Sequence, residues 1–147
     1  MRLVRAKRGD VLEISDCRKE SILNVNSDSY TEDAISEFIE DNKEEQILED
    51  ISSINVYCLK KRGKVVGTIS FYENKIDGLY VRPGYSGKGY GRRLLRFAEK
   101  KILKKYDNIL LYSTLNSESF YVRNGYHPGE VCISFSENPM AFVEMKK

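Results

Sequence analysis

Three glycines at alternate positions, Gly87, Gly89 and Gly91, stand between a run of β-branched and aromatic residues (76–81) and a segment with helical spacing. A chain with this pattern has to turn sharply from a strand into a helix, and glycine permits such a turn because it has no side chain. The first N–H groups of the helix are then free, and with Lys88 they would attract a phosphate group. The alternative is a tight turn that binds nothing. The helical spacing over residues 89–105 predicts an inward face made by four side chains: Leu94, Leu95, Ala98 and Ile102.

Two common phosphate-binding motifs do not fit this segment. A Walker A loop needs Gly-Lys followed by Ser or Thr, but Lys88 is followed by Gly89. A dinucleotide-binding fingerprint needs its third glycine at the position of Arg92. The glycine segment therefore matches neither a Walker A loop nor a dinucleotide-binding fingerprint.

The hydrophobic period of the rest of the chain changes from helical to extended. One predicted helix begins after Asp10, and its apolar face is Val11, Ile14, Ile22 and Val25. A second begins after Thr31, with the apolar face Ala34, Ile35, Phe38 and Ile39, and a short helical piece is predicted at 46–51. The other predicted helix is 118–124, which Gly125 ends. The predicted strands are 2–6, 55–60, 65–72, 76–81, 109–113, 131–135 and 141–145. The second to fourth read as an antiparallel meander, and 109–113 reads as a buried strand parallel to its neighbour. This order predicts an α+β domain with one mixed sheet covered by helices.

The length of 147 residues predicts one domain, 1–147, with its own core. The first residues contain no uninterrupted apolar run, so we expect neither a signal peptide nor a membrane span. Cys17, Cys58 and Cys132 are far apart and lack metal-ligand spacing. We expect reduced thiols in a cytoplasmic protein and no metal site.

The net charge of +2 is too small to indicate nucleic-acid binding, but the charges are unevenly distributed. Residues 28–50 contain ten acids and one base, Lys43, whereas residues 88–105 contain many bases and one acid, Glu99. Each segment is either a solvated helix face or a surface that meets a ligand of opposite charge, and both interpretations stay open. A nucleic-acid-binding protein ranks last, because no aromatic cluster accompanies the bases.

Two motifs together resemble the GNAT superfamily of N-acyltransferases. Val81-x-Pro83 followed by Ser86-Gly-Lys-Gly-Tyr-Gly91 looks like its acetyl-CoA signature, and Asn116-Ser-Glu-Ser-Phe-Tyr-Val-Arg-Asn-Gly-Tyr126 is similar to its second signature. Residues 30–32 and 76–81 also resemble a subgroup of small bacterial and archaeal members. The resemblance covers nearly the whole chain and implies a mostly antiparallel central sheet of about six to seven strands flanked by about four helices.

The resemblance implies that the chain binds acetyl-CoA or coenzyme A. The pyrophosphate would lie on the glycine loop, and the backbone of Leu79 and Val81 would receive the pantetheine arm where a bulge separates the fourth strand from the fifth. Ser86 departs from the family pattern, which usually has Arg or Gln there, and this weakens the expected pyrophosphate contacts. The exposed bases Arg92, Arg93 and Arg96 would meet the 3′-phosphate. The predicted cofactor-binding residues are Leu79, Tyr80, Val81, Ser86, Gly87, Lys88, Gly89, Tyr90, Gly91, Arg92 and Asn116.

Acetyl transfer to a primary amine needs a proton donor for the leaving thiolate and a base for the amine. Tyr121 stands where many family members have a general acid; its alternative is a ring packed under the sheet. Lys75 falls where one branch of the family carries a glutamate base, so the candidate base is Asp77, the one carboxylate of that strand, acting directly or through a water. A hydrogen-bonded strand residue that positions a loop is an equal alternative for Asp77. The sole histidine, His127, is expected in a surface turn.

The expected partner is a small-molecule amine or a peptide amine that enters between the first two helices and the closing strands. If the acids of 28–50 line that cleft, they would favour a cationic amine. A homodimer is left open, and no membrane partner is expected. The second hypothesis is a catalytically inactive acyl-CoA-binding module with a regulatory role.

Overall fold

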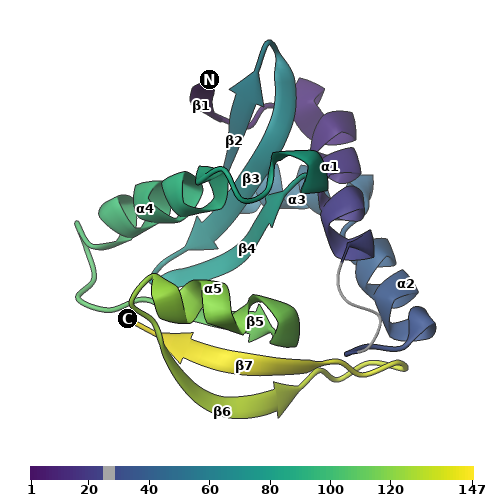
Figure 1. Cartoon of the computed structure of the whole chain (residues 1–147). Coiled ribbons are helices and arrows are strands. Elements are labelled where there is room, and N and C mark those ends of the chain that lie inside the picture. The colour runs from purple at the N-terminus through teal and green to yellow at the C-terminus, as the bar shows by residue number, and fades with distance from the viewer. Residues whose placement is uncertain (25–28) are drawn as a thin grey trace.

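The computed structural model describes residues 1–24 and 29–147, so the predicted positions of Val25 and Asp28 lie outside the described residues. Figure 1 shows the helices and strands of the whole chain. The strands are β1 (Arg2–Arg5), β2 (Asn55–Lys61), β3 (Lys64–Tyr72), β4 (Lys75–Val81), β5 (Leu110–Thr114), β6 (His127–Ile133) and β7 (Ala141–Lys146). The α-helices are α1 (Val11–Leu23), α2 (Glu32–Glu40), α3 (Glu44–Ser53), α4 (Tyr90–Ile102) and α5 (Glu118–Arg123).

All the described strands form one seven-stranded sheet in the order β1-β2-β3-β4-β5-β7-β6. The strands β2, β3 and β4 form the predicted antiparallel meander. The pair β4–β5 is parallel, as the apolar run of β5 predicts, and β7 runs antiparallel to both β5 and β6. The α+β class and the mixed, mostly antiparallel sheet are therefore confirmed.

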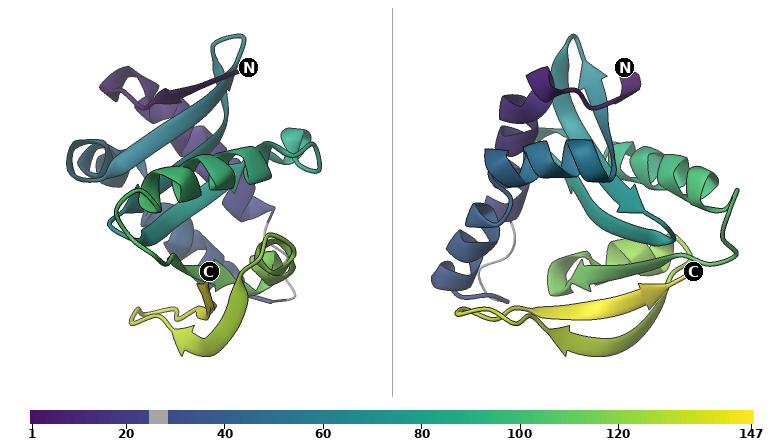
Figure 2. Two further views of the ribbon diagram at one scale, coloured as in Figure 1. Left: turned by 90° about the vertical axis from the view of Figure 1, so that its left-hand side faces the viewer. Right: turned by 180° about the vertical axis from the view of Figure 1, so that it is seen from behind.

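The helices cover both faces of the sheet, and each face has its own core. The helices α4 and α5 pack on one face, where Leu94, Leu95 and Tyr121 belong to the largest buried cluster. On the other face, Ile14 of α1 and Ile47 of α3 pack against β2 and β3. The helix α2 covers the end near β7, where Ala34 lies beside Met140. Figure 2 shows the two groups of helices on opposite sides of the sheet.

The sheet opens between β4 and β5. These strands pair only at Lys75–Leu110 and Ile76–Leu111 in the part of the chain that the structure describes, and they then diverge (Figure 1). A bulge marks the point of divergence, because Phe71 pairs with Ile76 while Ser70 pairs with Gly78, so Asp77 is an extra residue on β4. A bulge bends a strand and re-aims its side chains. The edge of β4 from Asp77 to Val81 is thus left facing an opening, as the resemblance implies.

Three details differ from the sequence-based expectations. The piece expected at 46–51 is a ten-residue helix, α3, so the sheet carries five α-helices and not about four. The strand β6 begins at His127, four residues before the predicted start, because it pairs with the far end of β7. His127 is exposed as expected, but it lies in a strand and not in a turn. The expected helix end at Lys105 is also too late, since α4 ends at Ile102.

Arg82, which follows β4, connects the end of this strand to α1 through hydrogen bonds and an ion pair. Its buried guanidinium donates from Nε to the Val65 carbonyl at 2.6 Å and from Nη2 to the Glu13 carbonyl at 3.2 Å. Its Nη1 also lies 3.0 Å from a carboxylate oxygen of Glu20. These bonds tie β3 and α1 together immediately before the glycine segment, so that segment starts from a fixed position.

Candidate active site

The glycine segment connects β4 to α4 through a 3₁₀ turn, Pro83–Tyr85. Gly87 and Gly89 have φ of +74° and +85°, a left-handed conformation that side chains with a Cβ rarely adopt. Gly89 is the residue that precedes α4, and its carbonyl accepts the first helical bond, from the Arg93 N–H at 3.0 Å. The first N–H groups of α4 have no partner within the helix, and they carry the positive end of its dipole.

These N–H groups border a cavity of about 520 Å³ that we call the cofactor cavity. One wall is the open edge of β4 and the other is α5 with the turn before it. The cavity is lined by Ser21, Asn24, Leu79, Val81, Tyr85, Ser86, Gly87, Gly89, Gly91, Arg92, Asn116, Ser117, Phe120, Tyr121 and Arg123. The glycine loop and the open edge of β4 thus border the same cavity.

Most of the predicted cofactor residues line this cavity. Of the eleven, Tyr80, Lys88 and Tyr90 do not. The Tyr80 side chain points to the other face of the sheet, toward α1. The Lys88 ammonium lies 5.8 Å from the centre of the ring of Tyr85, which does line the cavity. The Ser86 hydroxyl donates to the Pro83 carbonyl at 2.9 Å, so it closes its own turn.

A second cavity of about 470 Å³ lies on the other side of Tyr121, and we call it the acceptor cavity. It is enclosed by α1, α2, the diverging strands β4 and β5, and the β6–β7 hairpin. Its apolar lining includes Ile22, Phe38, Leu111, Tyr112, Ile133 and Phe142, and its polar lining includes Arg18, Asn42, Ser70, Lys75, Asp77, Ser113, Thr114 and Ser134. Ser21, Leu79, Ser117 and Tyr121 line both cavities, so the two spaces meet at the opening between β4 and β5.

Tyr121 is buried between these spaces, with 7% of its surface exposed. Its ring packs edge-on against Phe120 at 5.1 Å and Tyr126 at 5.7 Å between ring centres. Burial, and to a lesser degree the Tyr80 phenol nearby, raises the pKa of Tyr121 above the ordinary value of 10.0. The phenol therefore stays protonated at neutral pH.

Asp77 lies in the acceptor cavity, at the bulge of β4. Its Oδ2 accepts a long hydrogen bond from the Ser70 hydroxyl at 3.5 Å. Partial removal from water raises the pKa of Asp77 above 3.8, and the negative charge of Asp50 raises it further. The positive charges of Lys75 and Arg18 lower this pKa. The carboxylate is solvent-accessible, so it remains open to a molecule in the cavity.

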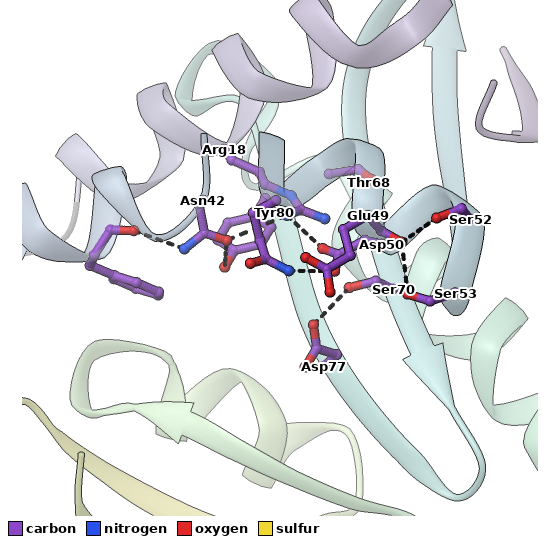
Figure 3. A network of polar contacts seen from close by, with 12 residues as sticks. Arg18, Asn42, Glu49, Asp50, Ser52, Ser53, Thr68, Ser70, Asp77 and Tyr80 are labelled. Carbon is purple, nitrogen blue, oxygen red and sulfur yellow. Dashed lines mark hydrogen bonds and ion pairs between the residues drawn. The ribbon is translucent and has the colours of Figure 1, made fainter. Parts of the chain in front are cut away.

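A buried polar network supports the wall beside Asp77 (Figure 3). Arg18 is 2% exposed, and its Nη1 donates to Asp50 at 3.3 Å and to Asn42 at 3.4 Å. The Tyr80 hydroxyl also donates to Asn42, at 3.4 Å, and the Arg18 guanidinium lies 5.5 Å from the centre of the Tyr80 ring. Among the described residues, Arg18 Nε is a buried nitrogen without a hydrogen-bond partner.

The described acids of residues 29–50 do not form a wall of the acceptor cavity. In the described part of this segment, the side chains that line the acceptor cavity are Phe38 and Asn42. The acids point outward or pair with protein groups: Glu37 accepts from the Asn138 N–H at 3.0 Å, and Asp50 pairs with Arg18. The described acids thus agree with a solvated helix face, which is the other interpretation that the sequence left open. The apolar spacing identifies the buried face of α2 but not which polar groups flank a cavity.

A comparison with known protein families agrees with this fold. Residues 26–147 match the family model described as the acetyltransferase (GNAT) domain. The chain belongs to the GNAT family. No curated protein sequence matches it.

Several solved structures are similar to this GNAT chain. The GCN5-related N-acetyltransferase from Rhodopseudomonas palustris has a TM-score of 0.93 and 21% identity, over 99% of this chain and 94% of that one. The PaiA N-acetyltransferase from Thermoplasma acidophilum, solved in complex with coenzyme A, has a TM-score of 0.80 and 26% identity, over 100% and 99%. YncA from Salmonella typhimurium, solved with acetyl-CoA, has a TM-score of 0.62 and 18% identity, over 100% and 92%.

The GNAT domain also contains cavity residues that the sequence did not single out. Ser21 and Asn24 come from the end of α1, and Arg123 comes from the last turn of α5. Arg123 lies inside the second motif and could have been noticed there, whereas nothing in the sequence places the end of α1 beside α5. Arg96, which was expected near the 3′-phosphate, does not line the cofactor cavity and pairs with Glu99 at 2.8 Å.

Two absences hold for residues 1–24 and 29–147, which the structure describes. No helix in that part is long and apolar enough to cross a membrane. No group of three or more His, Cys, Asp or Glu side chains there is placed to hold a metal ion.

Proposed function

We propose that residues 1–147 form one N-acetyltransferase domain that moves an acetyl group from acetyl-CoA to a primary amine. The observation that carries this proposal is that the cofactor cavity and the acceptor cavity meet at Tyr121. Two substrates in these cavities would bring an acetyl group and an amine together in one ternary complex. Such positioning replaces a bimolecular encounter by a reaction within the complex.

The cofactor cavity fits the parts of coenzyme A. The N–H groups of the glycine loop and of the first turn of α4 suit the pyrophosphate. Arg92 and Arg123 are the cationic side chains among the described lining residues, and they suit the remaining phosphate. The open edge of β4 at Leu79 and Val81 suits the amides of the pantetheine arm, which would add to the sheet like a further strand.

The chemistry needs two proton movements. The neutral amine attacks the acetyl carbonyl carbon, a C–N bond forms, and the C–S bond of the thioester breaks. Tyr121 gives its phenolic proton to the leaving thiolate, and its raised pKa keeps that proton available. Asp77 accepts the proton of the amine, directly or through a water in the acceptor cavity.

A thiol assay with a panel of primary amines tests this function. We expect acetyl-CoA to raise the melting temperature, and free CoA to be released only when an accepted amine is present. A blank without acetyl-CoA is needed, because Cys132 is only half-buried and its thiol can react, whereas Cys17 and Cys58 are buried. Acetyl-CoA binding without release of CoA for any amine would instead support the inactive acyl-CoA-binding module, which the departure at Ser86 weakly favours.

Asp77→Asn tests the base. The amide keeps an oxygen that can accept the Ser70 hydrogen bond but cannot take a proton, so we expect kcat/KM to fall about tenfold, below the usual effect of a general base, because water in the open cavity can substitute. In the wild type, kcat/KM should decrease as the pH falls through the raised pKa of Asp77 and its carboxylate is protonated. This acid limb should be absent in the variant.

Asp41→Asn is a matched control, because Asp41 is an exposed acid that does not line the acceptor cavity. An unchanged rate and an unchanged pH profile for Asp77→Asn would assign Asp77 the structural role of holding the bulge.

A further inference from the structure

The charged side chains of the acceptor cavity restrict the acceptor. Of the described residues that line it, Arg18, Lys75 and Asp77 carry a charge. Arg18 is already paired with Asp50, so this buried pair adds little net charge to the wall. An ammonium on Lys75 and a carboxylate on Asp77 remain.

Lys75 is held in place without being neutralised. It is the first residue of β4 and pairs with both Tyr72 of β3 and Leu110 of β5, where the sheet is still closed. Its Nζ lies 5.2 Å from the centre of the Tyr112 ring and 5.7 Å from the centre of the Tyr72 ring. None of the ion pairs formed by the described residues includes Lys75. Aromatic faces orient an ammonium but leave its N–H donors free for an anion.

The two groups are close enough to be used by one small molecule. Lys75 and Asp77 are two residues apart in β4, so their backbones are separated by at most about 7 Å. If Asp77 receives the amine that is to be acetylated, Lys75 stands beside it as an unused cation. Besides uncharged polar groups such as Ser70, the cavity is lined by apolar and aromatic side chains, among them Phe38, Tyr112 and Phe142.

We propose that the acceptor is an amine that also carries a carboxylate, of the amino-acid type, with an apolar or aromatic body. Lys75 binds the carboxylate, Asp77 receives the amine, and the apolar side chains contact the body. This inference rests on the proposed acetyl transfer and adds the class of its substrate. It replaces the cationic acceptor that an acid-lined cleft would have favoured, since the described acids of residues 29–50 do not line the cavity.

The test compares acceptors that differ only in the carboxylate. Standard amino acids are assayed for acetyl-CoA-dependent CoA release next to the corresponding amino-acid amides, and diamines and polyamines form a third arm. We expect kcat/KM for the best amino acid to exceed that of its amide about tenfold, the usual scale of a hydrogen-bonded charge pair. The KM of the amino acid should rise with salt, because salt screens the attraction.

Lys75→Met and Lys75→Glu assign this preference to one side chain. The ratio of kcat/KM for the amino acid to that for its amide should fall about tenfold in Lys75→Met, and it should reverse in Lys75→Glu. Lys101→Met is the matched control, because the Lys101 ammonium also lies over two rings, 5.6 Å from Tyr57 and 5.2 Å from Phe97, but outside the acceptor cavity. The control should keep the wild-type ratio.

The outcomes separate this inference from the function on which it rests. Release of CoA with polyamines or amides at least as efficient as with amino acids, or an unchanged ratio in Lys75→Met, would overturn the inference and leave acetyl transfer standing. Binding of acetyl-CoA without release for any of the three arms would overturn both. The acetyl-CoA-induced rise in melting temperature shows in every case that the variant is folded.

Discussion

Replacing Tyr121 by phenylalanine is expected to lower kcat about a hundredfold while the Kd for acetyl-CoA stays within about twofold of the wild type. The substitution keeps the ring contacts with Phe120 and Tyr126 and removes only the hydroxyl. The thiolate would then leave without a proton donor inside the protein. Steady-state release of CoA with an accepted amine measures kcat, and the acetyl-CoA-dependent melting temperature measures binding.

Tyr126→Phe is the control for this experiment. Tyr126 is also buried and touches the Tyr121 ring, but its hydroxyl donates to Glu99 at 2.8 Å and it lines neither cavity. Its loss should cost about 1.5–3 kcal/mol of stability, as for other hydrogen bonds to charged groups, and leave kcat near the wild-type value. Equal turnover in Tyr121→Phe and the wild type would exclude Tyr121 as the acid.

Gly91→Glu is expected to abolish the stabilisation by acetyl-CoA. Gly91 lies in the first turn of α4 and lines the cofactor cavity, and a Cβ there would lie 3.4 Å from the Phe120 ring. A carboxylate at this position would place bulk and negative charge where the pyrophosphate is proposed to bind. A ligand at a hundredfold excess over its Kd stabilises a protein by about 2.7 kcal/mol, so the loss is easily measured as a missing shift in melting temperature.

Gly84→Glu adds the same side chain a short distance before the loop. Gly84 does not line the cofactor cavity, and a Cβ there meets no atom within 4 Å. This control should therefore keep the acetyl-CoA shift. A wild-type shift in folded Gly91→Glu would mean that the phosphates bind elsewhere.

The sequence alone predicted the glycine turn and the buried face of α4. The alternate glycines predicted a strand-to-helix turn, and the left-handed φ of Gly87 and Gly89 explains why glycine is needed there. A helix repeats every 3.6 residues, so the spacing of the apolar residues likewise predicted the buried face of α4, which is formed by Leu94, Leu95, Ala98 and Ile102. Such features depend on a few neighbouring residues and can be read before the fold is known.

Features that depend on long-range packing could not be predicted in this way. Strict alternation along a strand places Asp77 and Tyr80 on opposite faces, but the bulge at Asp77 shifts that phase. The buried charge of Arg18 gave no signal, since its partner Asp50 is 32 residues away on another helix. The outward direction of the acids on α2 follows from how that helix lies on Met140 and Phe142, which its own spacing does not encode.

The opening between β4 and β5 divides the sheet into β1–β4 and β5–β7, and residues in or near both parts line each cavity. Among the described residues, two pairs join β4 and β5, so the sheet is weakly connected at this point. Leu79 of β4 and Asn116, which follows β5, both line the cofactor cavity, and Asp77 of β4 and Tyr112 of β5 both line the acceptor cavity. A molecule in either cavity would contact both sides of this opening. If the first substrate to bind restricts the motion of the two sides, it carries that entropic cost, and we expect the second substrate to bind more tightly. By thermodynamic linkage the gain in affinity would be the same whichever substrate binds first.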